Sequence, residues 1–242
     1  MWFLLAKLAS PKKFFHFSNQ TLPWVTFLFV ILFSYGIIGG LFLSPPDYLQ
    51  GEGFRIIYVH APSAFLSLLI YVVMSCAAFS NIVFRLKLAP LVIRHSAPIG
   101  ASFTFLALFT GSLWGKPMWG TWWIWDARLT SELILFFLYL SILLFQSSIA
   151  HKQSGERALA ILILVGAIDI PIIHYSVYWW NTLHQGATLS LFTQSKIDSS
   201  MLFPLLAMMI AFFLYYVMIL FLKIRYELIA LDANPHWLGE KK

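Results

Sequence analysis

Residues 201–222 read MLFPLLAMMIAFFLYYVMILFL, an unbroken apolar stretch without a single charge. An α-helix rises about 1.5 Å per residue, so this stretch is long enough to cross the roughly 30 Å hydrocarbon core of a bilayer. Backbone polar groups cannot be left unpaired in hydrocarbon, and a helix pairs them within its own segment. The stretch therefore predicts a transmembrane helix.

The rest of the chain repeats this pattern. Apolar windows lie at 24–43, 61–84, 97–114, 133–150, 158–175 and 201–222. Of the 242 residues, 60% are apolar and 11% are charged, and the mean hydropathy is +0.79. A water-soluble domain cannot hide that much apolar surface. We therefore expect an all-α polytopic membrane protein with one six-helix domain over residues 1–242 and short loops. Pro171, inside the fifth window, should kink or end its helix.

The basic residues predict how the helices are oriented. Of the 16 Lys and Arg residues, all but Arg55, Lys116, Arg128 and Lys196 fall at the termini and in the loops near 85–94 and 152–157. Short cytoplasmic loops carry the excess of Lys and Arg, so both termini are predicted to be cytoplasmic. Loops 44–60, 115–132 and 176–200 should then face outward. This distribution accounts for the net charge of +6 without a nucleic-acid partner.

Two kinds of chemistry are not expected from this chain alone. Cys76 is the sole cysteine, so an internal disulfide or a Cys-x-x-Cys redox pair is excluded. The sequence also lacks the Gly-x-x-x-x-Gly-Lys-Ser/Thr phosphate loop, so any ATP hydrolysis must come from a partner. No classical enzyme activity is expected.

Tryptophan is concentrated in one outer loop. Residues 119–130 read WGTWWIWDARLT, and five tryptophans fall within residues 114–125, at Trp114, Trp119, Trp122, Trp123 and Trp125. An interfacial aromatic belt is the alternative explanation, but a belt decorates both membrane interfaces and several helices. A dense cluster instead predicts an aromatic shelf that suits a large flat apolar ligand.

Charged residues accompany this shelf. Arg128, with its five N–H donors, is placed to meet acidic groups at the edge of such a ligand. Arg55, in the outer loop before the second helix, is a further candidate for that role. Asp126 is expected to anchor the loop through Arg128 or indole N–H groups. The roles of His174 and of Asp169, an acid inside the fifth window, stay open.

Two histidines are predicted at the same outer level. His60 lies in Tyr58-Val-His-Ala-Pro62, immediately before a predicted helix whose positive end disfavours protonation of the imidazole. His184 follows a second tryptophan pair, Trp179 and Trp180. Two neutral imidazoles from different loops form a plausible axial pair for haem iron. Zinc is the competing metal, but it needs three or four ligands, and no compact set of these occurs on the outer side.

The pattern Trp119-Gly-x-x-Trp-x-Trp-Asp-x-Arg-Leu-Thr130 resembles the "WWD" signature of the haem-handling proteins of cytochrome c maturation. With the chain length, the six spans and the His-Ala-Pro context of His60, it is similar to the haem exporter protein C (CcmC) family of maturation system I. The resemblance implies non-covalent haem b with His60 and His184 as axial ligands. It also implies that the tryptophans, Asp126 and Arg128 of the loop hold the macrocycle and its propionates.

The family further implies a place and partners. The chain would lie in the bacterial inner membrane and present haem on the periplasmic side to the haem chaperone CcmE. Its other partners would be an ABC-type ATPase, a second membrane subunit and a small single-span subunit.

Three other functions compete with this one. A b-type cytochrome passes electrons, but it usually has histidine ligands well inside facing helices. A pore-forming ABC permease subunit would leave the tryptophan loop without a purpose. A related protein that attaches haem directly to apocytochrome shares the signature, but generally carries more spans and a large outer domain.

Overall fold

The computed structural model describes residues 10–148, 153–180, 182–184 and 197–231. Within these ranges the chain is helical, and its only β-type pairing is an isolated bridge between Asp47 and Gly51. Six segments are long and apolar enough to cross a membrane, at Pro11–Leu43, Glu52–Phe84, Ala89–Trp119, Ala127–Ser148, Ser154–Trp179 and Ser199–Ala230. The predicted all-α fold with six membrane-spanning segments is confirmed.

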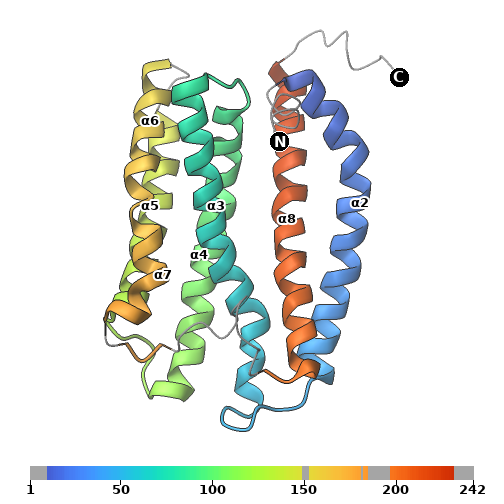
Figure 1. The fold of residues 1–242 in the computed structure, drawn as a ribbon, viewed down its shortest axis with the longest axis vertical. Helices are drawn as coiled ribbons and strands as arrows, with labels where there is room; N and C mark the ends of the chain where they lie inside the picture. Colours follow the sequence, from blue (N-terminus) through green and yellow to red (C-terminus); the bar gives the residue numbers. More distant parts are fainter. Residues whose placement is uncertain (1–9, 149–152, 181, 185–196, 232–242) are drawn as a thin grey trace.

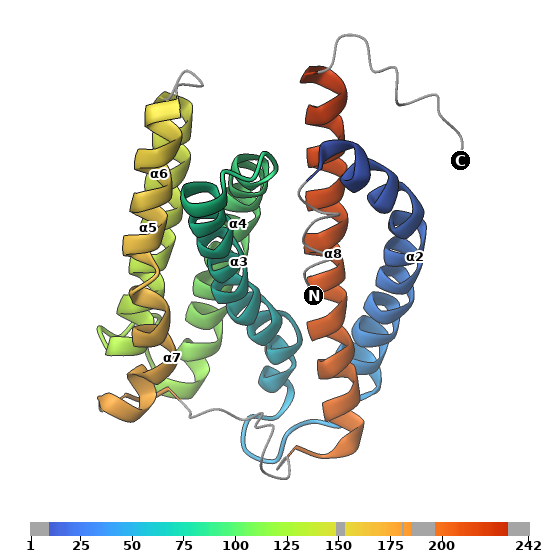
Figure 2. The same cartoon turned by 45° about the horizontal axis from the view of Figure 1, so that its top comes forward.

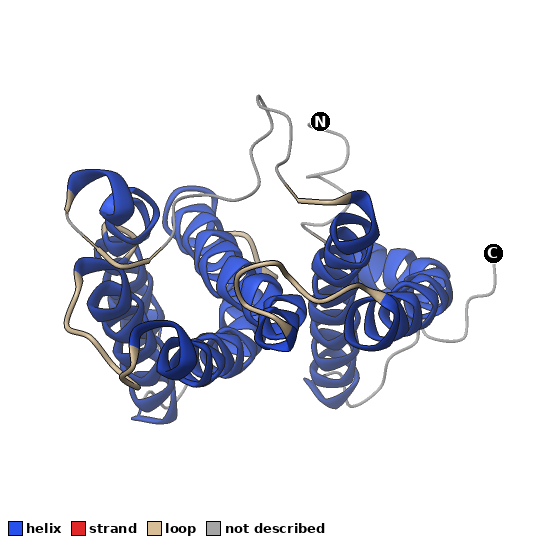
Figure 3. Ribbon diagram, turned by 90° about the horizontal axis from the view of Figure 1, so that it is seen from below, coloured by secondary structure: helices blue, strands red, loops and turns tan. Residues whose placement is uncertain are grey.

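The helices form an elongated bundle (Figures 1 and 2). In chain order they are α2 (Pro11–Ile37), a π-helical turn (Ile38–Leu43), a 3₁₀ turn (Glu52–Ile56), α3 (Ile57–Phe84), α4 (Ala89–Trp119), α5 (Ala127–Ser148), α6 (Gln153–Gly166), α7 (Asp169–Trp179) and α8 (Ser199–Leu231). Helix α2 packs along α8, α3 along α4, and α5 contacts α4, α6 and α7. Figure 3, seen from the end opposite the start of α2, shows the helices nearly end-on.

The connections after the π-helical turn, after α4 and after α7 all lie at that same end of the bundle (Figure 1). The described parts of the loops predicted to face outward therefore lie at one end of the bundle. The start of α2, the α3–α4 connection and the end of α8 lie at the opposite end. Residues 1–9, 149–152 and 232–242, which carry part of the basic excess, lie outside the described residues.

Several helix ends differ from the apolar windows. Helix α4 continues to Trp119 and α5 begins at Ala127, so the predicted loop 115–132 shortens to residues 120–126. Helix α3 begins at Ile57, so His60 is its fourth residue and does not precede the helix. Hydropathy windows detect hydrocarbon crossing, whereas caps and turns set the true ends of a helix. Gly120, with φ 76°, ends α4 in the left-handed conformation that glycine tolerates best.

The expected break near Pro171 is present. Helix α6 ends at Gly166 and α7 begins at Asp169, so the fifth span consists of two helices joined by a turn. Proline has no N–H with which to bond the carbonyl of residue 167, and its ring clashes with that carbonyl in a continuous helix. The N–H of Ile170 bonds the Ala167 carbonyl instead, at 3.2 Å.

Close helix contacts depend on small residues facing large ones. A side chain at Gly36 would collide with Met208, and one at Gly100 would collide with Tyr139. Small residues let membrane helices approach closely, where packing replaces the hydrophobic effect as the driving force. The buried Tyr139 hydroxyl donates to the backbone carbonyl of Ser67 at 2.7 Å, which ties α5 to α3. This pairing fixes the two helices that flank the candidate site.

Candidate functional site

His60 is oriented by α4. Its Nδ1 atom lies 3.1 Å from the Ala107 carbonyl oxygen and 3.0 Å from Oγ1 of Thr110. A carbonyl oxygen can only accept, so Nδ1 carries the hydrogen and Nε2 keeps its lone pair. Thr110 in turn donates to the Leu106 carbonyl at 2.6 Å. A Cβ at Gly111 would lie 3.0 Å from Cε1 of His60, so glycine leaves the imidazole its space.

His184 faces His60 from a different segment. The centroids of the two imidazole rings are 6.5 Å apart, and the ring planes are inclined by 35°. His184 also packs against Trp119, with ring centroids 6.3 Å apart. Its backbone N–H bonds Oγ1 of Thr182 at 3.0 Å. The structure thus brings together the two predicted histidines, 124 positions apart in the chain.

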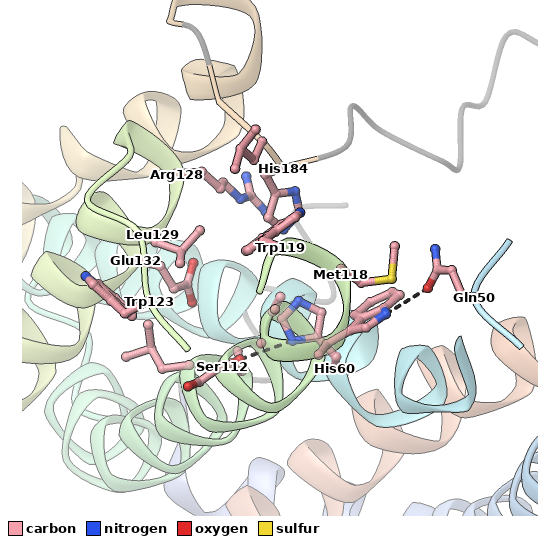
Figure 4. A pocket seen from close by; sticks show the side chains of 17 residues that line it. Gln50, His60, Ser112, Met118, Trp119, Trp123, Arg128, Leu129, Glu132 and His184 are labelled. Atoms are coloured by element: carbon pink, nitrogen blue, oxygen red, sulfur yellow. Dashed lines mark hydrogen bonds between the residues drawn. The ribbon is translucent and has the colours of Figure 1, made fainter. Parts of the chain in front are cut away.

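Both histidines line one recess, which Figure 4 shows from close by. Its empty volume is about 840 Å³, including the part open to solvent. The lining comes from α3, α4, α5 and the segments before α3 and after α7. It consists of Gln50, His60, Ala64, Ala107, Leu108, Gly111, Ser112, Trp114, Gly115, Met118, Trp119, Trp123, Arg128, Leu129, Glu132, Leu183 and His184.

The five tryptophans of the predicted aromatic shelf fall into two groups, those that line the recess and those that do not. Trp114, Trp119 and Trp123 line the recess. Trp114 meets the His60 ring edge-on at 5.6 Å, and its indole N–H donates to Oε1 of Gln50 at 2.8 Å. Trp122 and Trp125 lie outside the lining and are 53% and 76% exposed. Three of the five tryptophans can therefore cover a flat ligand directly.

The charged residues of the signature have different surroundings. Asp126 caps α5, because its Oδ1 accepts the N–H of Leu129 at 2.8 Å, and its Oδ2 accepts the hydroxyl of Thr182. Arg128 lines the recess and donates to the Ile173 carbonyl at 2.7 Å. Arg55 lies outside the lining and binds Glu52, the Gly40 carbonyl and Oγ of Ser44. The geometry thus joins Arg128 to the site and leaves Arg55 in structural contacts.

Comparison of the sequence with known proteins identifies its family. Residues 4–239 match the family described as "Heme exporter protein C" (CcmC). The chain belongs to the Heme exporter protein C family. It is 45% identical to "Heme exporter protein C" of Haemophilus influenzae over 98% of this chain and 97% of the relative. It is 43% identical to the Escherichia coli K12 protein of the same name, over 99% and 97%.

A relative from a plant extends the comparison. The chain is 49% identical to the "putative cytochrome c biosynthesis ccmC-like mitochondrial protein" of Marchantia polymorpha, over 72% of this chain and 73% of that one. The match to the Heme exporter protein C family, together with six apolar helices, supports a multi-pass membrane protein.

Several residues that line the recess of this Heme exporter protein C family member were not among the site residues predicted from the sequence. Gln50 accepts the indole N–H of Trp114, and Met118 of α4 is also part of the lining (Figure 4). Glu132 is 7% exposed, and Ser67 donates to its Oε1 at 2.8 Å. An acid in a membrane span is a functional candidate, and Glu132 lies inside the span Ala127–Ser148. The apolar window that began at residue 133 had left it in the loop.

Proposed function

We propose that this chain binds haem between His60 and His184 and passes it to the chaperone CcmE during the maturation of c-type cytochromes. Membership of the Heme exporter protein C family supports a role in haem handling. The observation that carries the proposal is the facing pair of imidazoles, 6.5 Å apart, at a recess lined by three indoles.

The ring separation suits a metal held between the two histidines. Two metal–nitrogen bonds of about 2 Å each, plus a ring radius of roughly 1 Å on either side, span roughly 6 Å. His60 has the tautomer that such a bond needs, because the Ala107 carbonyl fixes the hydrogen on Nδ1. Two imidazoles on one haem iron leave no open coordination position, which limits reactions with oxygen. Haem bound in this way is a cargo protected from side reactions.

The remaining lining fits the other parts of haem. The indoles of Trp114, Trp119 and Trp123 offer apolar area for the porphyrin face. Arg128 has further N–H donors beyond the one bonded to Ile173, and these are suited to a propionate. Arg55 already binds Glu52, Gly40 and Ser44, so we assign propionate binding to Arg128 alone.

Transfer to CcmE takes place, in this proposal, on the periplasmic side of the bacterial inner membrane, where the recess opens. The chain has no phosphate loop of its own, so we assign ATP hydrolysis to an ABC-type ATPase acting with a second membrane subunit. A small single-span subunit completes the complex. Family membership supports these partners as a group, and the sequence bias of Lys and Arg supports the orientation.

Visible spectroscopy of the purified protein tests haem binding. We expect a six-coordinate haem spectrum, weakened or changed in both His60→Ala and His184→Ala. His174→Ala is the matched control, because His174 lies on α7 outside the recess lining and packs against Tyr175. A wild-type protein that takes up no haem, or histidine variants with unchanged spectra, would contradict the proposed site.

A second measurement tests delivery. Trp119→Ala and Trp123→Ala should lower the amount of haem loaded onto co-expressed CcmE, because both indoles line the recess. An electron-carrying cytochrome would give a different result. Quinol would reduce its haem, which would then reoxidise, and the two tryptophan variants would change neither the haem spectrum nor the loading of CcmE.

A further inference from the structure

Glu132 is a buried acid with an unused oxygen at the proposed haem site. It lies in the second turn of α5, is 7% exposed and lines the recess. Ser67 donates to its Oε1, whereas its Oε2 has no hydrogen-bond partner within the described part of the chain. A buried carboxylate oxygen without a partner is costly. The unpartnered oxygen therefore indicates a function connected with what the recess holds.

Helix geometry places Glu132 relative to the proposed haem iron. His60, Ala64 and Ser67 follow one another at helical spacings of four and three residues, so they share one face of α3. Ser67 lies seven residues after His60, which is roughly 10 Å along the helix axis. The Glu132 carboxyl group, bonded to Ser67, thus lies deeper in the bundle than the histidine pair. It is close enough to act on a charge there through space.

The charges around Glu132 leave a place for a positive partner. Among the described residues that line the recess, Arg128, one turn earlier on α5, is the only Lys or Arg, and it bonds the Ile173 carbonyl. Asp169 of α7 is a second buried acid, and its Oδ2 lacks a partner among the described residues. A buried acid needs an opposite charge in its surroundings. Positive charge held in the recess would therefore be favourable for the Glu132 carboxylate.

We propose that the Glu132 carboxylate stabilises the ferric over the ferrous form of the haem between His60 and His184, and so biases the oxidation state in which haem is delivered. This inference rests on the proposed function. The dianionic porphyrin core carries one net positive charge with Fe³⁺ and none with Fe²⁺. A fixed negative charge favours the first. A unit charge about 10 Å away, at an effective dielectric constant of about 20, changes the ferric-to-ferrous ratio by roughly tenfold.

A redox titration of haem-loaded protein in detergent tests this. The ferric and ferrous fractions are read from the visible spectrum, with a dye of known potential as reference. At the ambient potential where wild type is half reduced, Glu132→Gln should raise the ferrous-to-ferric ratio about tenfold, equivalent to 59 mV for one electron. Glu132→Asp, which keeps the charge, should remain closer to wild type than Glu132→Gln.

Asp169→Asn is the matched control. It also removes a buried acid, but Asp169 lies outside the recess lining, so its effect should be smaller than that of Glu132→Gln. If Glu132→Gln does not accumulate, Ser67→Ala decides, because loss of the hydrogen bond to Oε1 disfavours the carboxylate and should raise the ferrous fraction.

A Glu132→Gln ratio within twofold of wild type, or one shifted toward the ferric form, would overturn the inference while leaving haem binding intact. If Glu132→Gln does not accumulate and Ser67→Ala is measured in its place, an unchanged ferrous-to-ferric ratio in Ser67→Ala would overturn the inference. A wild-type protein that binds no haem would instead remove the proposed function itself.

Discussion

Gly111→Ala should weaken haem binding without removing any group that contacts haem. Its new Cβ would lie 3.0 Å from Cε1 of His60 and 3.5 Å from Nδ1. The first distance is several tenths of an ångström shorter than ordinary van der Waals contact, so the imidazole must move. Its hydrogen bonds to Ala107 and Thr110 and its contact with Trp114 oppose that movement.

These restraints set the free-energy cost of moving the His60 imidazole. An imidazole pushed off its preferred rotamer costs about 1 kcal/mol, which lowers haem affinity about fivefold. Titration of haem into the detergent-solubilised variant, followed at the main absorption band, measures the dissociation constant. Gly53→Ala is the control, because a Cβ at Gly53 meets nothing within 4 Å. Equal affinities for Gly111→Ala and wild type would refute the claim that α4 fixes the position of His60.

Three further variants test individual contacts. Trp123→Phe should lower haem affinity several-fold because Trp123 lines the recess. Trp125 lies outside the recess and its side chain is 76% exposed, so Trp125→Phe should leave haem affinity unchanged. Equal losses of affinity in the two variants would contradict the distinction between lining and exposed tryptophans. Asp126→Ala should lower the free energy of unfolding by about 1 kcal/mol through loss of the α5 cap, measured by thermal unfolding in detergent, and an unchanged midpoint would contradict that role. Gln50→Ala should cost haem affinity a few-fold because the indole N–H of Trp114 loses its acceptor, and spectral titration against wild type checks this.

The spans were predictable from sequence because the requirement that fixes them is general. Hydrocarbon demands long apolar helices, and the windows found all six. The ends of the helices were less accessible. The start of α5 depends on the Asp126 side chain reaching the N–H of Leu129, and this cap moved Glu132 from a predicted loop into a membrane helix. Hydropathy averages over many residues, so it cannot register a single capping bond.

The direction of long side chains was also beyond the sequence. Arg55 precedes His60 by five residues, and proximity in the chain suggested that both serve one ligand. The guanidinium instead bonds the Gly40 carbonyl and Ser44, at the end of the preceding span. Those residues lie 15 and 11 positions before Arg55 and become its neighbours only in the folded chain. Tertiary contacts of this kind leave no periodic signal in the chain.

Asp126 explains why an acid belongs in the tryptophan-rich segment. Its Oδ1 caps α5, which carries Arg128 and Glu132, and its Oδ2 accepts the hydroxyl of Thr182. The same hydroxyl oxygen accepts the backbone N–H of His184. One carboxylate thus joins the turn that follows α4 to the segment that holds the second imidazole. The anchoring role expected for Asp126 thus has partners other than Arg128 or an indole N–H, namely Leu129 and Thr182, and it links the two sides of the recess.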